Sequence, residues 1–202
     1  MKISYIGATI IGLASMALIN VHAADAKAGQ EKSVACAGCH GVDGNSVNPI
    51  WPRLAGQHAS YLVKQMKDFK VGNRVDSTMQ AMVAALSDSD IADIAAYYAS
   101  QKPATASFDA SLLAQGENIY RGGISETSVA ACMGCHSPSG KGNGPAAYPS
   151  LNGQHAEYIT IQLSKFKDGS RANDAGKMMR NVANRMSDKE MKSVSAYVAG
   201  LK

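Results

Sequence analysis

Aromatic residues are scarce in this chain: they make up 6% of its 202 residues, with a single Trp and three Phe. Aromatic side chains usually dominate the packing of a core, so the composition hints that something else fills the interior. The excess of basic over acidic residues is also small, with a formal net charge of +4. A nucleic-acid-binding protein shows a larger and more clustered basic excess, which excludes that class of partner.

Long hydrophobic runs are missing except at the start of the chain. Lys2 precedes an apolar stretch from Ile6 to Ile19, which is followed by small residues. This pattern is typical of a secretory signal peptide, and the run is shorter than the roughly 20 residues that a membrane-spanning helix needs. We therefore expect residues 1–23 to be a signal peptide cleaved after Ala23 and the mature protein to lie in the periplasm. An uncleaved anchor is the alternative.

The rest of the chain repeats itself. A Cys-x-x-Cys-His pentapeptide and a Pro-x-Leu-x-Gly-Gln-His segment each occur twice, at residues 36–40 and 132–136 and at residues 52–58 and 149–155. A repeat of this length is too long for a solenoid and predicts tandem domains. Residues 101–107 have the composition of a linker. The N-terminal domain is accordingly expected at 24–103 and the C-terminal domain at 104–202.

Each copy predicts helices. Ser87 and Asp90 resemble a capping box at a helix start, and Ser187 and Glu190 repeat it. Helical spacing of apolar residues predicts helices at 87–101, from 187 onward, at about 57–70 and at about 154–167. A short helix is also expected before each cysteine pair. No alternating strand pattern of useful length is present, so the predicted fold class is all-α. Because such small domains bury little apolar surface, a large bound group would supply the missing core.

All four cysteines lie in the two pentapeptides, and several chemistries compete for them. A disulfide within Cys-x-x-Cys would close a small loop and stabilise little. A thioredoxin-like pair would need a βαβ setting, and four thiolates on one zinc ion would leave the two histidines unexplained. Covalent attachment of haem uses every residue, with two thiols on the vinyl groups and the imidazole on iron. The residues concerned are Cys36, Cys39 and His40, and Cys132, Cys135 and His136.

The opposite face of each haem needs a sixth ligand. His58 and His155 occupy matching places, but each stands at the start of an amphipathic helix, where an exposed polar residue is expected. Methionine is the better candidate, and aligning the final helices of the two copies pairs Met79 with Met179. If the difference in length between the copies fell after the methionine, Met82 would pair with Met179 instead.

The Pro-x-Leu-x-Gly segment has a role in the same arrangement. An axial histidine generally donates its other ring N–H to a carbonyl or a carboxylate, which sets its tautomer and orientation. Pro52 and Pro149 could present such carbonyls, although an ordinary turn explains the motif equally well. Arg74 and Arg171 could meet haem propionates or remain solvated surface charges.

These residues resemble the class I cytochromes c, and the tandem form resembles the dihaem cytochrome c4 family over essentially the whole mature chain. The likeness rests on both Cys-x-x-Cys-His motifs, both Pro-x-Leu-x-Gly-Gln segments and the Ser-Asp starts of the final helices. It implies two class I cytochrome c domains related by pseudo-twofold symmetry, two covalently bound haem c groups and His/Met ligation of each iron. The family pattern places the ligating methionines at Met79 and Met179.

With both iron positions filled, the chain is expected to carry electrons rather than to catalyse a reaction. The resemblance implies a monomeric periplasmic carrier, soluble or peripherally membrane-associated, between a respiratory donor complex and a terminal oxidase. The alternative is a haem-bearing subunit of a dehydrogenase or flavoprotein complex. A dihaem peroxidase would need a vacant iron position, and we do not expect it.

Overall fold

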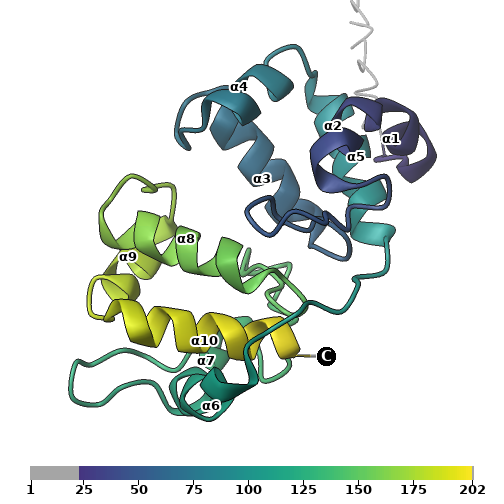
Figure 1. Ribbon diagram of the computed structural model, residues 1–202. Coiled ribbons are helices and arrows are strands. Elements are labelled where there is room, and N and C mark those ends of the chain that lie inside the picture. The colour runs from purple at the N-terminus through teal and green to yellow at the C-terminus, as the bar shows by residue number, and fades with distance from the viewer. Residues whose placement is uncertain (1–22, 202) are drawn as a thin grey trace, which may run out of the picture.

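The computed structural model describes residues 23–201, and its helices form two groups (Figure 1). The predicted signal peptide, apart from Ala23, lies outside the described residues, so its cleavage stays a prediction. The first group consists of α1 (Ala26–Lys32), α2 (Val34–His40), α3 (Ala59–Lys70), α4 (Ser77–Val83) and α5 (Asp88–Ser100). The second consists of η1 (Ala110–Leu112), α6 (Leu113–Gly122), α7 (Met133–His136), α8 (Ala156–Lys167), η2 (Ala175–Lys177), α9 (Met178–Ala183) and α10 (Asp188–Gly200).

Within this described range the only extended pairings are two isolated β-bridges, Ile124 with Val129 and Asn143 with Tyr148. The all-α prediction is therefore confirmed. An extended stretch after α5 connects the two groups, which lie beside one another as separate domains (Figure 1). No helix in residues 23–201 is both long and apolar enough to cross a membrane.

The final helix of each domain begins with the predicted capping box. The Asp90 N–H donates to Ser87 Oγ over 3.1 Å, and the Ser87 N–H donates to Asp90 Oδ2 over 2.9 Å. Ser187 and Glu190 make the same reciprocal pair at the start of α10. These contacts satisfy backbone N–H groups that a helix start leaves without intrahelical partners.

Each domain has its own core. In the N-terminal domain a cluster of buried side chains joins α3 to α5: Leu62, Ile94, Ala95, Tyr97 and Tyr98. The C-terminal cluster is larger and draws on α6, α8, α9 and α10, with Tyr120, Phe166, Met186 and Met191 among its members. In both domains the first α-helix packs against the last, α1 against α5 and α6 against α10.

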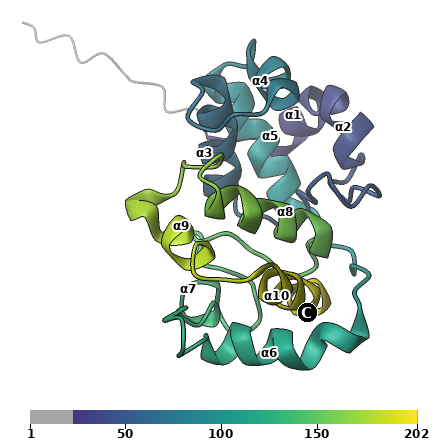
Figure 2. The same cartoon turned by 60° about the vertical axis from the view of Figure 1, so that its left-hand side comes forward.

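Helices α3 and α8 lie on the facing sides of the two domains (Figures 1 and 2). The contacts between the two domains are reciprocal. Arg74 of the N-terminal domain donates to Tyr158 of α8 over 3.0 Å, and Arg171 of the C-terminal domain donates to Tyr61 of α3 over 2.9 Å. Because equivalent residues exchange equivalent contacts, the two domains are related by a pseudo-twofold axis.

Candidate functional site

The two pentapeptides form short helices that carry their cysteines and histidine together. In the N-terminal domain, Cys36, Cys39 and His40 all lie on α2. In the C-terminal domain, α7 holds Cys135 and His136, and Cys132 is its N-cap residue. One helical turn thus brings two sulfur atoms and one imidazole to the same region of each domain.

None of the four cysteines forms a disulfide. Burial raises the pKa of Cys36 and raises that of Cys132 to about 11. A redox-active Cys-x-x-Cys pair needs a lowered thiol pKa, so these two thiols lack the property that a thioredoxin-like role requires. The two pairs also lie in different domains, and residues 23–201 contain no group of three or more Cys, His, Asp or Glu arranged to hold a metal ion.

Both pentapeptide histidines are buried and oriented by a proline carbonyl. His40 Nδ1 lies 2.9 Å from the Pro52 oxygen, and His136 Nδ1 lies 3.0 Å from the Pro149 oxygen. Burial lowers the pKa of each imidazole, although the proline carbonyl opposes the shift. The neutral ring therefore donates its Nδ1–H to the carbonyl and keeps the Nε2 lone pair for a metal. The predicted contact of the Pro-x-Leu-x-Gly segment is confirmed.

The loops that present these carbonyls are held in the same way in both domains. The Leu54 N–H donates to the Gly44 carbonyl over 2.7 Å, and the Leu151 N–H donates to the Gly140 carbonyl over 2.7 Å. Both leucine side chains are half-buried and pack against the core of their own domain.

Met79 and Met179 occupy equivalent places in α4 and α9. Each stands eight residues before the capping serine of the final helix, and each helix ends on a buried residue, Val83 or Ala183. The extra residues of the second copy come earlier and include the 3₁₀ turn η2. Met79, rather than Met82, is therefore the structural counterpart of Met179.

The methionines of α4 and α9 also differ in how far their side chains are exposed to solvent. Met79 and Met179 are half-buried, and Met179 packs against the C-terminal core. Met82 is 39% exposed and Met178 is 43% exposed.

The expectation that His58 and His155 are exposed is wrong. His155 is 8% exposed, and its Nε2 lies 2.9 Å from the Ser46 carbonyl oxygen of the other domain. His58 is half-buried, and its Nε2 lies 2.8 Å from the Lys141 carbonyl oxygen. Both residues are N-caps whose rings cross the domain boundary, a contact that amphipathicity within one helix does not report.

The arginines that follow α3 and α8 lie at the same boundary. Arg171 is 6% exposed, so a fully solvated charge is excluded there. Arg74 donates to Gln65 and Gln162, and Arg171 donates to the same two amides, over 2.8–3.2 Å. Each guanidinium also stacks on the phenyl ring of its own domain, Phe69 or Phe166.

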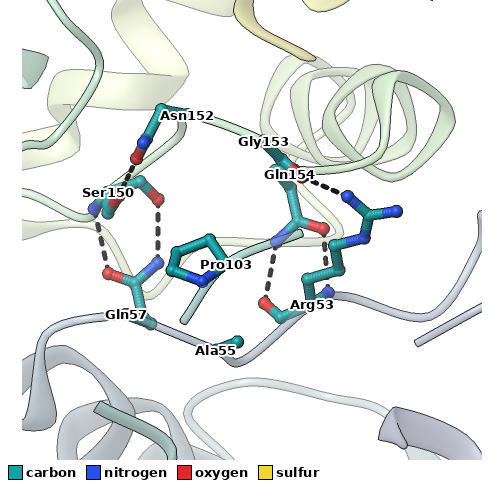
Figure 3. Close-up of a pocket in the computed structure, with 8 residues that line it drawn as sticks. All are labelled: Arg53, Ala55, Gln57, Pro103, Ser150, Asn152, Gly153 and Gln154. Carbon is teal, nitrogen blue, oxygen red and sulfur yellow. Dashed lines mark hydrogen bonds between the residues drawn. The ribbon is translucent and has the colours of Figure 1, made fainter. Parts of the chain in front are cut away.

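Gln57 and Gln154 belong to the repeated Pro-x-Leu-x-Gly-Gln-His segment, whose pattern alone gives these two residues no role. Both are 8% exposed, and each side-chain amide forms two hydrogen bonds with the backbone of the other domain (Figure 3). Their presence at matching places in both copies was the one signal available in the sequence.

The residues present fit a c-type haem in each domain. The donor set is duplicated: two thiols, a buried imidazole with Nε2 available, and a half-buried thioether from a separate helix. Within the described residues, every hydrogen-bond acceptor of Arg74 and Arg171 is a neutral oxygen. Two adjacent guanidinium groups at this boundary are suited to receive anionic groups such as propionates.

Comparison with known proteins agrees with this geometry. The cytochrome c family model matches residues 26–102 and 123–202. A cytochrome c4 from Azotobacter vinelandii is 48% identical over 191 residues, covering 89% of this chain and 91% of that protein. A thiosulfate dehydrogenase electron acceptor from Stutzerimonas stutzeri is 38% identical, covering 84% of this chain and 80% of that protein.

A solved structure is similar over most of the chain. The crystal structure of reduced recombinant cytochrome c4 from Pseudomonas stutzeri has a TM-score of 0.86 and 45% sequence identity, covering 89% of this chain and 100% of that one. Both the two-domain architecture and the sequence therefore match the same group of proteins. The chain belongs to the cytochrome c4 family and is a dihaem electron-transfer protein that carries two haem c groups.

Proposed function

We propose that each domain holds its haem with its own pentapeptide and one methionine. The cysteines form thioether links to the vinyl groups, and the histidine and methionine are the axial iron ligands. The residues are Cys36, Cys39, His40 and Met79 in the N-terminal domain, and Cys132, Cys135, His136 and Met179 in the C-terminal domain. The bound haem supplies one-electron chemistry at iron.

The observation that carries this proposal is the duplicated contact between a buried histidine and a proline carbonyl. In His40 and His136, Nδ1 forms a hydrogen bond with a backbone oxygen at 2.9–3.0 Å. This bond orients the ring and leaves Nε2 for the metal. Such a contact raises the basicity of an imidazole ligand. The same arrangement in both domains supports two centres of the same type.

Arg74 and Arg171 fit the role of propionate partners at the domain boundary. Their acceptors are neutral, and both groups are held by amides and by an aromatic ring. A carboxylate that entered this network would make charge-assisted hydrogen bonds. The two haem edges would then lie close to the same pair of positive charges, which favours transfer between the two centres.

A centre with both axial positions filled has no site for oxygen, peroxide or an organic substrate. We therefore propose that the protein carries electrons in the periplasm, from a respiratory donor to a terminal oxidase, and has no catalytic activity of its own. The transient partners of such a carrier need only a small interface. A carrier role also agrees with the net charge, which gives no strong steering toward one partner.

A second candidate function is favoured by two relatives that are named thiosulfate dehydrogenase electron acceptors. The protein from Stutzerimonas stutzeri that is 38% identical is an acceptor for thiosulfate dehydrogenase. By analogy, this chain could take electrons from a dehydrogenase or serve as its haem-bearing subunit. Stable co-purification with a dehydrogenase would support that role, whereas a chain that purifies alone supports the free carrier.

A redox titration followed by optical spectroscopy tests the main proposal. The mature protein should contain two haems, both low-spin with the spectrum of His/Met ligation, and should show no peroxide-dependent turnover. A single chromophore, a five-coordinate iron at rest, or turnover with peroxide would each contradict the proposal. His40→Ala should damage the N-terminal centre alone, and His136→Ala the C-terminal centre alone.

A further inference from the structure

Two glutamine side chains cross the domain boundary in opposite directions. Gln154 of the C-terminal domain accepts from the Arg53 N–H over 2.9 Å and donates to the Arg53 carbonyl over 2.9 Å. Gln57 of the N-terminal domain makes the same pair of bonds with Ser150, over 2.9 Å and 2.8 Å. Figure 3 shows these two glutamine–backbone pairs, Gln57 with Ser150 and Gln154 with Arg53, on either side of Pro103.

The residues that the glutamines bind, Arg53 and Ser150, directly follow the two prolines whose carbonyls orient the histidines. The Arg53 N–H and the Pro52 carbonyl belong to one planar peptide group, and so do the Ser150 N–H and the Pro149 carbonyl. A continuous chain therefore runs from His40 Nδ1 through the Pro52–Arg53 peptide to Gln154 Oε1. An equivalent chain runs from His136 Nδ1 through the next proline peptide to Gln57.

Hydrogen bonds in such a chain reinforce one another. When the amide oxygen of Gln154 accepts from the Arg53 N–H, it polarises the peptide and makes the Pro52 oxygen a stronger acceptor. A stronger acceptor gives the His40 ring more electron density, which favours the oxidised state of a metal that it binds. The glutamine also keeps the peptide plane in place, and with it the orientation of the ring.

The orientation of each glutamine amide is itself well determined. Gln154 Oε1 also accepts from the His155 N–H over 3.0 Å, and Gln57 Oε1 accepts from the His58 N–H over 3.0 Å. Each oxygen thus faces two backbone donors, while the amide nitrogen faces a backbone carbonyl. Since both side chains are 8% exposed, water competes little for these bonds.

We infer that Gln57 and Gln154 are reciprocal positioning residues: each domain uses its glutamine to hold the peptide that orients the axial histidine of the other domain. This inference rests on the proposed ligand role of His40 and His136. Its consequence is that the potential of each haem depends on the docking of both domains. Separation of the domains, or a partner that changes their contact, would shift both potentials in the same direction.

The test is the variant Gln154→Leu, measured by redox titration with NMR assignment of the two haems. Loss of the acceptor should raise the potential of the N-terminal haem, the one ligated through His40, and leave that of the C-terminal haem nearly unchanged. The Nδ1–H signal of His40 should shift in parallel. Gln57→Leu should have the mirror effect, on the C-terminal haem and His136.

Two further variants keep the test decisive. Gln154→Asn withdraws the amide by one methylene while it retains a polar side chain, so it should produce the same crossed shift if the leucine variant fails to fold. Ser60→Ala removes another bond across the boundary, from Ser60 Oγ to the Gly144 carbonyl at 3.0 Å, without touching either proline peptide. Its two potentials should equal those of the unmodified protein.

The outcomes separate this inference from the proposed function. If the unmodified protein shows two low-spin His/Met haems and Gln154→Leu shifts only the C-terminal potential or neither potential, the reciprocal role is wrong and the proposed function stands. Equal shifts of both potentials in Gln154→Leu and Ser60→Ala would also overturn it, since any loosening of the boundary would then suffice. If the unmodified protein lacks His/Met haems, the proposed function itself fails.

Discussion

The backbone of Gly116 in α6 passes directly over Ser193 in α10: a Cβ added to Gly116 would lie 2.1 Å from the Ser193 carbonyl oxygen. Gly29 has the same relationship to Asp93 where α1 crosses α5, with a distance of 1.9 Å. The crossing of the first and last α-helices therefore depends on glycine in both domains. No side chain fits between the two backbones without moving one of the helices.

We expect Gly116→Ala to destabilise the C-terminal domain by about 1–3 kcal/mol, because the added methyl group forces α6 away from α10. Gly122→Ala, in the same helix, is the matched control, since a Cβ there meets nothing within 4 Å. That variant should be as stable as the unmodified protein or slightly more so. Thermal unfolding followed by circular dichroism measures both. Equal melting temperatures for the two variants would show that the helices do not cross this closely.

Met79→Ala and Met179→Ala should each lower the potential of one haem, because the thioether favours ferrous iron. The fall should be on the order of 0.1 V, a fraction of the roughly 0.8 V range that axial ligation covers. Each variant should also bind imidazole or cyanide at the opened position. Met82→Ala and Met178→Ala, at the exposed neighbouring positions, serve as controls and should keep native spectra. Native spectra in the first pair would refute the ligand assignment.

The contact of His155 with Ser46 should make the domain boundary sensitive to acid. Burial lowers the pKa of His155 from its ordinary value of 6.5, with Arg53 acting in the same direction and the Ser46 carbonyl and Glu157 opposing. Since the folded state disfavours the protonated ring, the stabilising contribution is present above pH 6.5 and is lost as the pH falls through the folded-state pKa.

Melting temperatures at pH 7.5 and at about pH 5 check this expectation. The unmodified protein should lose stability over that interval. His155→Gln cannot titrate but can still donate to the Ser46 carbonyl, so its melting temperature should fall by a smaller amount. If both proteins lose the same amount, the acid sensitivity has another origin.

Loss of the covalent haem should harm the N-terminal domain more than the C-terminal one. The N-terminal cluster contains five buried residues and the C-terminal cluster contains eleven, so the first domain has less apolar packing of its own. We expect Cys36→Ser with Cys39→Ser to remove one haem and leave its domain open to limited proteolysis. Cys132→Ser with Cys135→Ser should remove the other haem and leave its domain more resistant. Equal resistance would contradict this ranking.

Much of the architecture could be predicted from local patterns. The capping boxes at Ser87 and Ser187, the helices that follow them and the duplication of the pentapeptide all depend on residues close together in the chain. The sequence did not decide whether His40 contacts Pro52. Twelve positions separate the two residues, and an ordinary turn would explain the proline equally well. The structure confirms it in both domains.

By itself, the sequence determined the helical class and the tandem organisation and predicted two haem c groups, because helical spacing, capping and the pentapeptide are properties of short segments. Only the tertiary structure decided that His155 and Arg171 are buried and that Gln57 and Gln154 reach across the boundary. These contacts join residues about a hundred positions apart in the sequence. Burial at the domain boundary depends on how the surfaces of the two folded domains pack together. The periodicity of apolar residues within one helix carries no information about the packing between domains.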